Sequence, residues 1–251
     1  MKYAGSKARI FKKIMPLILD GRSENQPYVE PFLGGANSMQ FVGGIRIGGE
    51  FNKYIAKMWI DLLDGVTMPV LTKDHYNQVK NNKDAYEDSY VGWVGVACSY
   101  SGKWFGGFAG KVETKGGERD YQAEAHKNLE KQLPLLSGLQ VNNCSYDELH
   151  IPDNSIIYCD PPYADTLKYK DDFNSIEFWE WARKKAEQGH KVLVSEYKAP
   201  DDFVCVWEQE VKSSLSANGK SGGSKKSIEK LFVHESQHTS QQQKHNAIQL
   251  S

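Results

Sequence analysis

The tetrapeptide Asp-Pro-Pro-Tyr at residues 160–163 carries the clearest chemistry in the sequence. Its two prolines favour an extended backbone and have no N–H groups, so the loop offers acceptors, namely the Asp160 carboxylate and the Pro161 carbonyl. Tyr163 adds an aromatic face. This set suits a planar substrate with an amino group, such as a nucleobase with an exocyclic amine, because both N–H bonds can reach acceptors while the ring stacks. The alternative interpretation is an ordinary turn.

The elements around this loop predict an α/β fold. An apolar run at 155–159 predicts a buried strand, so the loop lies where that strand leaves the sheet, which is where ligands bind in open α/β sheets. Another strand, at 27–32, is followed by a glycine-rich turn at 33–37 and the start of a helix. A strand at 45–50 then ends in the acid Glu50. A strand, a glycine-rich turn and a helix start form the local geometry of nucleotide-type cofactor sites.

Capping residues and apolar spacing predict the remaining elements of the fold. They are a helix over 6–19 capped by Ser6, a helix capped by Asn52, a helix capped by Asn174 and stopped by Gly189, and strands at 191–196 and 203–207.

The regular alternation of strands and helices stops between about residues 67 and 145. We interpret 67–145 as an inserted, mostly helical subdomain, and 1–66 together with 146–235 as the main domain. The Gln-, Ser- and His-rich composition of 236–251 predicts a disordered tail.

Composition limits the classes of protein that fit. The 251 residues, 39% of them hydrophobic, are enough for one sizeable α/β core. No apolar run approaches the length of a membrane span, and the first residues lack the apolar core of a signal peptide, so we expect a cytoplasmic protein without membrane contact. The cysteines form no Cys-x-x-Cys pair, which predicts buried free thiols rather than a zinc site or disulfides: Cys98, Cys144, Cys159 and Cys205.

The formal net charge of −1 gives no global attraction to a polyanion, so nucleic-acid binding would depend on local patches. Two basic clusters exist, and each fits either solvated surface charge or nucleic-acid contact. They are Lys2, Lys7, Arg9, Lys12 and Lys13 near one end, and Lys220, Lys225, Lys226 and Lys230 near the other.

Four elements in order resemble the S-adenosylmethionine-dependent DNA adenine-N6 methyltransferases of the Dam type. They are the opening segment Lys-Tyr-Ala-Gly-Ser-Lys at 2–7, the segment Tyr-Val-Glu-Pro-Phe-Leu-Gly-Gly at 28–35, the acid Glu50 and the tetrapeptide at 160–163. The family normally has Asp where this chain has Glu50. The resemblance spans most of the chain, and it implies a Rossmann-like methyltransferase fold with an inserted DNA-recognition subdomain.

The resemblance also implies a site for S-adenosylmethionine. Lys7 would pair with the methionyl carboxylate, the glycines would let the backbone approach the methionyl part closely, and Glu50 would accept hydrogen bonds from the ribose. The alternative for Glu50 is an exposed strand end. The implied cofactor-binding residues are Tyr3, Lys7, Glu30, Phe32, Gly34, Gly35, Glu50 and Asp160.

The implied reaction moves a methyl group to N6 of an adenine rotated out of duplex DNA, at a specific site. Acceptors at the amine would localise its lone pair, and the Asp160 carboxylate would stabilise the developing positive charge. The catalytic residues would be Asp160, Pro161, Pro162 and Tyr163. Neither a metal nor an obligatory protein partner is required, and the setting would be a bacterial or phage-infected cell.

We predict DNA contact by the Gly-, aromatic- and Lys-rich stretch at 99–111. Lys103 and Lys111 would meet phosphates, and Trp104 would act as a wedge. The alternative places the aromatic residues in the core of the subdomain. This chain has Ser99-Tyr100 where the family often has Asn-Arg, so family target sequences do not carry over.

Two further functions compete with this one. An adenosylmethionine enzyme could act on another planar amine, such as RNA adenine, cytosine N4 or a glutamine side chain; related families with those targets tend to have Asn or Ser where this chain has Asp160. A non-catalytic DNA-binding relative is the other possibility, and the intact Asp160, Tyr163, Lys7 and glycines argue against it.

Overall fold

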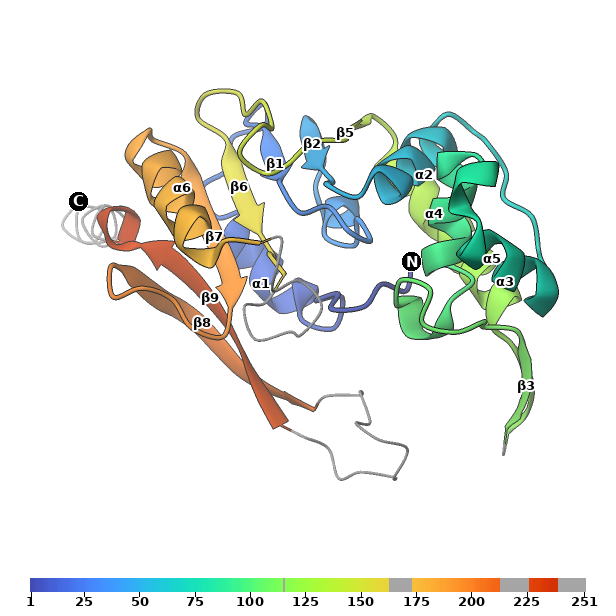
Figure 1. Cartoon of the computed structure of the whole chain (residues 1–251). Coiled ribbons are helices and arrows are strands. Elements are labelled where there is room, and N and C mark those ends of the chain that lie inside the picture. Colours follow the sequence, from blue (N-terminus) through green and yellow to red (C-terminus); the bar gives the residue numbers. More distant parts are fainter. Residues whose placement is uncertain (115, 163–172, 213–225, 239–251) are drawn as a thin grey trace. The chain divides into compact units, whose positions relative to one another are not determined.

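The computed structural model describes residues 1–114, 116–162, 173–212 and 226–238 (Figure 1). The chain forms two compact units, one from residues 1–16 and 23–150 and the other from residues 17–22 and 151–251. The elements in chain order are α1 Phe11–Ile18, β1 Tyr28–Glu30, η1 Met39–Phe41, β2 Arg46–Gly49, α2 Lys53–Leu63, α3 Lys73–Asn81, η2 Lys83–Ala85, α4 Asp88–Val96, η3 Tyr100–Gly102, β3 Lys111–Thr114, β4 Gly117–Asp120, α5 Tyr121–Gln132, η4 Leu133–Leu136, β5 Leu139–Asn142, β6 Ile156–Cys159, α6 Ser175–Glu187, β7 Lys191–Glu196, β8 Phe203–Lys212 and β9 Lys226–His234, where η denotes a short 3-10 turn.

The first unit contains the parallel strands β5, β2 and β1, in that order across the sheet. Tyr28 pairs with Arg46 in the β1–β2 ladder, and Arg46 pairs with Leu139 in the β2–β5 ladder. Because the strands are parallel, their carboxyl ends meet at one edge of the sheet. The turn after β1 and the acid after β2 therefore lie at the same edge. Strand β5 falls inside the range 67–145. The interpretation of this range as an inserted subdomain remains a prediction.

Helices α2 and α4 pack closely in the first unit (Figure 1). Helix α2 begins as predicted, because the Asn52 side chain accepts a hydrogen bond of 3.0 Å from the backbone N–H of Tyr54. At Gly92 of α4 an added Cβ would lie 2.1 Å from the Tyr54 carbonyl oxygen, so only glycine permits this approach. Trp59 of α2 and Trp93 of α4 are fully buried.

The start of the first helix differs from the prediction. Helix α1 begins at Phe11 rather than after Ser6. The Ser6 hydroxyl instead accepts hydrogen bonds from the backbone N–H of Ala8, at 3.2 Å, and from the Asn37 side chain, at 3.0 Å. Ser6 therefore anchors the opening segment to residues that follow β1. The helix predicted after the glycine-rich turn is a single 3-10 turn, η1, after which Val42 is extended.

The second unit contains β6, β7, β9 and β8 in that order. Strands β6 and β7 are parallel, whereas β9 pairs antiparallel with both β7 and β8. Strand β8 extends to Lys212, beyond the predicted end at residue 207, because it pairs with β9 over its whole length (Figure 1). Helix α6 starts at the predicted cap, since the Asn174 side chain accepts hydrogen bonds from the backbone N–H groups of Ile176 and Glu177.

The parallel pairs β1–β2, β2–β5 and β6–β7, with α2 to α5 between β2 and β5 and α6 between β6 and β7, confirm the α/β prediction.

The cysteine prediction is partly wrong. All four thiols are free, but only Cys98 and Cys159 are buried; Cys144 is half-buried and Cys205 is exposed. Strand β8 is the outermost strand of its unit, and its register with β9 shifts between Cys205 and Trp207, so apolar neighbours in the sequence do not ensure burial.

Residues 236–238 of the predicted tail are helical, and 239–251 lie outside the described residues. Among the helices of the described part of the chain, none combines the length and apolarity needed to cross a bilayer.

Candidate active site

The glycine-rich turn after β1 is built around the opening segment. An added Cβ at Gly34 would lie 2.8 Å from the Tyr3 ring, and one at Gly35 would lie 2.7 Å from the Tyr3 Cβ. Gly34 also has a φ of +48°, which favours glycine. The Trp59 indole N–H donates to the Gly34 carbonyl at 2.8 Å. The two glycines thus leave room for Tyr3, while α2 holds the turn.

Glu50 closes the same turn from the end of β2. Its Oε2 accepts a hydrogen bond from the Gly34 N–H, and its Oε1 accepts one from the Asn52 N–H, both at 2.9 Å. The residue is only 8% exposed, which excludes the alternative of an exposed strand end. Burial raises the pKa of Glu50 to about 7, although the two backbone hydrogen bonds act in the opposite direction. A buried acid of this kind sits directly against the turn.

Glu30, at the end of β1, takes part in a buried network. It is 4% exposed, and its Oε1 accepts hydrogen bonds from the Tyr28 hydroxyl, at 2.6 Å, and from the Ser38 hydroxyl. Lys7 is also buried, and its Nζ donates to the Gly5 carbonyl at 3.5 Å. Glu30 is therefore tied to Ser38, just after the glycine-rich turn, and Lys7 is tied to the backbone of the opening segment.

Two aromatic residues border these groups. Phe32 is half-buried and stacks on Tyr146, with ring centroids 5.5 Å apart. Phe51 directly follows Glu50, and it is 74% exposed. Phe51 was not predicted from the sequence, although an aromatic residue next to the acid was a usable signal. A ligand held by Glu50 would have this ring available for stacking.

Gln132 of α5 is a second residue that the sequence analysis missed. It is 3% exposed, and its Nε2 donates to the carbonyls of Gly35, at 3.0 Å, and Ala36, at 3.1 Å. No local pattern in the sequence distinguishes this glutamine, because its partners are almost a hundred residues away in the chain.

The Asp-Pro-Pro segment belongs to the second unit. Asp160 directly follows β6 and is half-buried, as is Pro162, while Pro161 is buried. The Tyr158 and Ser195 hydroxyls share a buried hydrogen bond of 2.8 Å that joins β6 to β7 just before this loop. The fourth predicted catalytic residue, Tyr163, lies outside the described residues.

The predicted cofactor residues divide between the two units. The first unit contains seven of them, in which Tyr3 packs against the two glycines and Gly34 is hydrogen-bonded to Glu50. Asp160 is in the second unit.

The predicted DNA-contact residues differ in their surroundings. Lys103 is exposed, and so is Lys111 on β3, whose Nζ lies 3.2 Å from a Glu118 oxygen. Trp104 is half-buried and stacks on Tyr54, with centroids 5.7 Å apart. Phe105 is buried, which favours the core alternative for that ring. DNA contact by Lys103, Trp104 and Lys111 stays a prediction.

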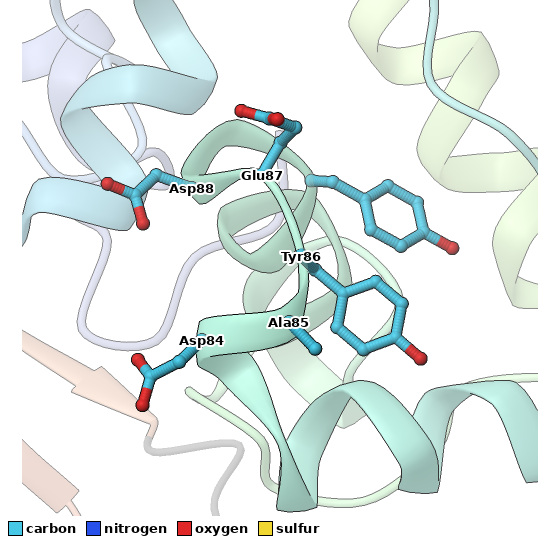
Figure 2. Close-up of a pocket in the computed structure, with 6 residues that line it drawn as sticks. Asp84, Ala85, Tyr86, Glu87 and Asp88 are labelled. Atoms are coloured by element: carbon cyan, nitrogen blue, oxygen red, sulfur yellow. The ribbon is translucent and has the colours of Figure 1, made fainter.

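A separate pocket of about 600 Å³ lies at the start of α4. Asp84 and Asp88 point to one side of the chain there, and the Tyr86 ring points to the other side (Figure 2). The lining is acidic, so it would repel a phosphate backbone, and it includes none of the predicted site residues. Within the described ranges, no three His, Cys, Asp or Glu side chains form a group that could hold a metal ion.

Parallel strands that end in a glycine-rich turn, a buried acid and an Asp-Pro-Pro loop define a Rossmann-like methyltransferase fold. A family model of the D12 class N6 adenine-specific DNA methyltransferases matches residues 3–246, and the chain belongs to this family. The resemblance to Dam-type enzymes is thereby confirmed, and the activity of the family is methylation of adenine in DNA. Comparison with curated proteins finds no match.

Proposed function

We propose that this protein transfers a methyl group from S-adenosylmethionine to N6 of an adenine flipped out of duplex DNA, at a specific sequence. The observation that carries the proposal is the Asp-Pro-Pro segment placed directly after the buried strand β6. Such a position is typical of ligand-binding residues in open α/β sheets.

Asp160 and Pro161 supply the chemistry at the amine. The N6 lone pair of adenine is delocalised into the ring, so the nitrogen is a poor nucleophile. Acceptors at the Asp160 carboxylate and the Pro161 carbonyl favour a pyramidal amine and thus localise the lone pair. The carboxylate then stabilises the positive charge that develops on nitrogen as it attacks the methyl carbon and the C–S bond breaks. Tyr163 stacks on the extrahelical base and offsets part of the cost of flipping it.

The cofactor is bound by the first unit. Glu50 accepts hydrogen bonds from the ribose hydroxyls, and Phe51 stacks on the adenine of the cofactor. Lys7 pairs with the methionyl carboxylate, near the glycine-rich turn against which Tyr3 packs. The support for this arrangement is the contact of Glu50 with the turn and the exposed ring that follows it.

DNA is held by positive charge that does not read sequence. Lys103 and Lys111 are exposed and able to contact phosphates. Trp104 enters the gap left by the flipped base, in competition with its present packing on Tyr54.

Transfer of labelled methyl groups tests the proposal. Purified protein is mixed with methyl-labelled S-adenosylmethionine and with unmethylated duplex DNA of mixed sequence or RNA, and the modified nucleosides are then identified. We expect N6-methyladenine in DNA only. Label on cytosine or RNA would support the other planar amines, and DNA binding without any transfer would support a non-catalytic relative. Once the target sequence is mapped, 2-aminopurine fluorescence at the target position should rise on binding if the base is flipped.

A further inference from the structure

We propose that Gln132 is a positioning residue for the cofactor: it fixes the glycine-rich turn in the conformation that binds the methionyl part of S-adenosylmethionine. The inference rests on the proposed function, because it assumes that this turn contacts the cofactor. It gives the helix α5, which lies in the range 67–145 predicted to recognise DNA, a role in the cofactor site.

Side chains hold three consecutive carbonyls of the turn. The Trp59 indole N–H donates to Gly34, at 2.8 Å, and the Gln132 amide donates to Gly35 and Ala36, at 3.0 and 3.1 Å. In a planar trans peptide the C=O and the next N–H point in opposite directions. Fixing these carbonyls therefore fixes the direction of the three N–H groups that follow them. Gln132 sets two of the three.

The turn needs such a restraint. Ala36 has a φ of +50°, in the left-handed region that residues with a Cβ adopt only at a cost. Its side chain is fully buried, and its N–H donates to the Leu33 carbonyl at 2.9 Å. A strained residue persists only where its surroundings hold it. The two hydrogen bonds from Gln132 to this turn are such a hold.

Gln132 is itself held in place. Only 3% of the residue is exposed, and its side-chain oxygen accepts a hydrogen bond from the amino group of Met1. The donor and acceptor of the amide are therefore both engaged. An amide whose oxygen and nitrogen both form hydrogen bonds presents its N–H groups in one direction, and positioning the turn requires this.

Helix α5 also offers a matched control. Gln122 is another buried glutamine on the same helix, 5% exposed. Its Nε2 donates to the Leu71 carbonyl at 2.8 Å, and its Oε1 accepts from the Leu71 N–H at 2.9 Å. Both glutamines thus bond to backbone, but only Gln132 touches the glycine-rich turn. A general loss of stability should affect both variants, whereas a positioning effect should affect one.

The test measures two ligands by calorimetry on the wild type, Gln132→Met and Gln122→Met. Methionine keeps the length of glutamine and removes its donors. The ligands are S-adenosylmethionine and methylthioadenosine, which lacks the amino-acid part. We expect Gln132→Met to weaken S-adenosylmethionine binding by about tenfold or more and to leave methylthioadenosine binding unchanged. Gln122→Met should bind both ligands as the wild type does.

Three results would overturn the inference. The first is an unchanged affinity of Gln132→Met for S-adenosylmethionine. The second is an equal loss of affinity for both ligands, or an equal loss in both variants, because either would indicate a structural role only. In the third, the wild type binds neither ligand, which would overturn the proposed function as well. Circular dichroism checks folding first. If Gln132→Met does not fold, Gln132→Glu, which keeps the shape and the acceptor but lacks the amide donors, decides the question by the same comparison.

Discussion

The Gly34 backbone N–H donates a 2.9 Å hydrogen bond to Oε2 of Glu50, across sixteen residues of sequence. This bond joins the turn after β1 to the acid after β2. The same carboxyl group is buried, and its pKa is raised to about 7. Because we propose that Glu50 binds the ribose, we expect the affinity for the cofactor to depend on pH.

Cofactor binding should release a proton. Ribose hydroxyls donate to a carboxylate more strongly than to a protonated carboxyl group, so binding should lower the pKa of Glu50 from about 7. We expect S-adenosylmethionine affinity to rise with pH through this range. Calorimetry near pH 7 in buffers with different ionisation enthalpies counts the released protons. Glu50→Gln should release none and should bind more weakly; proton release that persists in this variant would show that another group titrates.

The same acid should make stability depend on pH. The folded pKa of Glu50, about 7, exceeds its ordinary value of 4.5, so the folded state binds more protons between these values. The stabilisation that protonated Glu50 contributes is complete below about pH 4.5 and is lost as pH rises through 7. Relative to Glu50→Gln, the wild type should lose on the order of 3 kcal/mol of unfolding free energy between those limits. Urea titrations at several pH values give this difference, and a difference that does not change with pH would refute the assignment.

His190 should act in the opposite sense. Its Nδ1 accepts a hydrogen bond from the Ser155 N–H at 3.2 Å, and burial lowers its pKa, with a smaller contribution from Lys185. The unfolded state therefore binds the proton more tightly. The contribution of neutral His190 to the stability of the folded state is complete above about pH 6.5 and is lost as pH falls through the lower folded pKa. His190→Gln keeps an acceptor that does not protonate. We expect the variant to gain stability over the wild type when pH falls from about 7.5 to about 5. The same dependence of stability on pH in the variant and in the wild type would contradict this prediction.

Lys103 and Lys111 should contribute charge to DNA binding but not sequence preference. Removing either lysine should weaken binding to all sequences and reduce the slope of log affinity against log salt by about 0.9. Fluorescence anisotropy over a salt series measures the slope. Lys184→Ala on α6 is the control, because Lys184 is also exposed. A slope that matches the wild type in both test variants would remove these lysines from the interface.

The strands and helix caps were predictable because their signals are local. The apolar run before Asp160 gave β6, and the side-chain acceptors of Asn52 and Asn174 gave the starts of α2 and α6. The start of α1 was wrong because Ser6 bonds to Asn37, thirty-one residues away.

The parts of the site that could not be predicted depend on distant partners. Glu50 was selected from its position after a strand, but its burial and its bond to Gly34 follow from packing of the turn against β2 and α2. Gln132 was missed because its significance comes from the Gly35 and Ala36 carbonyls. The extent of β8 depends on its pairing with β9.

Single-turnover methyl transfer by Asp160→Ala tests the central claim most directly. Enzyme in excess over unmethylated duplex DNA is loaded with labelled S-adenosylmethionine, and N6-methyladenine is measured over time. Asp160 lies in a loop after β6, so the variant should remain folded, with a melting temperature near that of the wild type. We expect the wild type to form N6-methyladenine and the variant to be at least about a thousandfold slower, as for the loss of a charge-stabilising group. A folded variant that transfers methyl groups at a rate near that of the wild type would contradict the account.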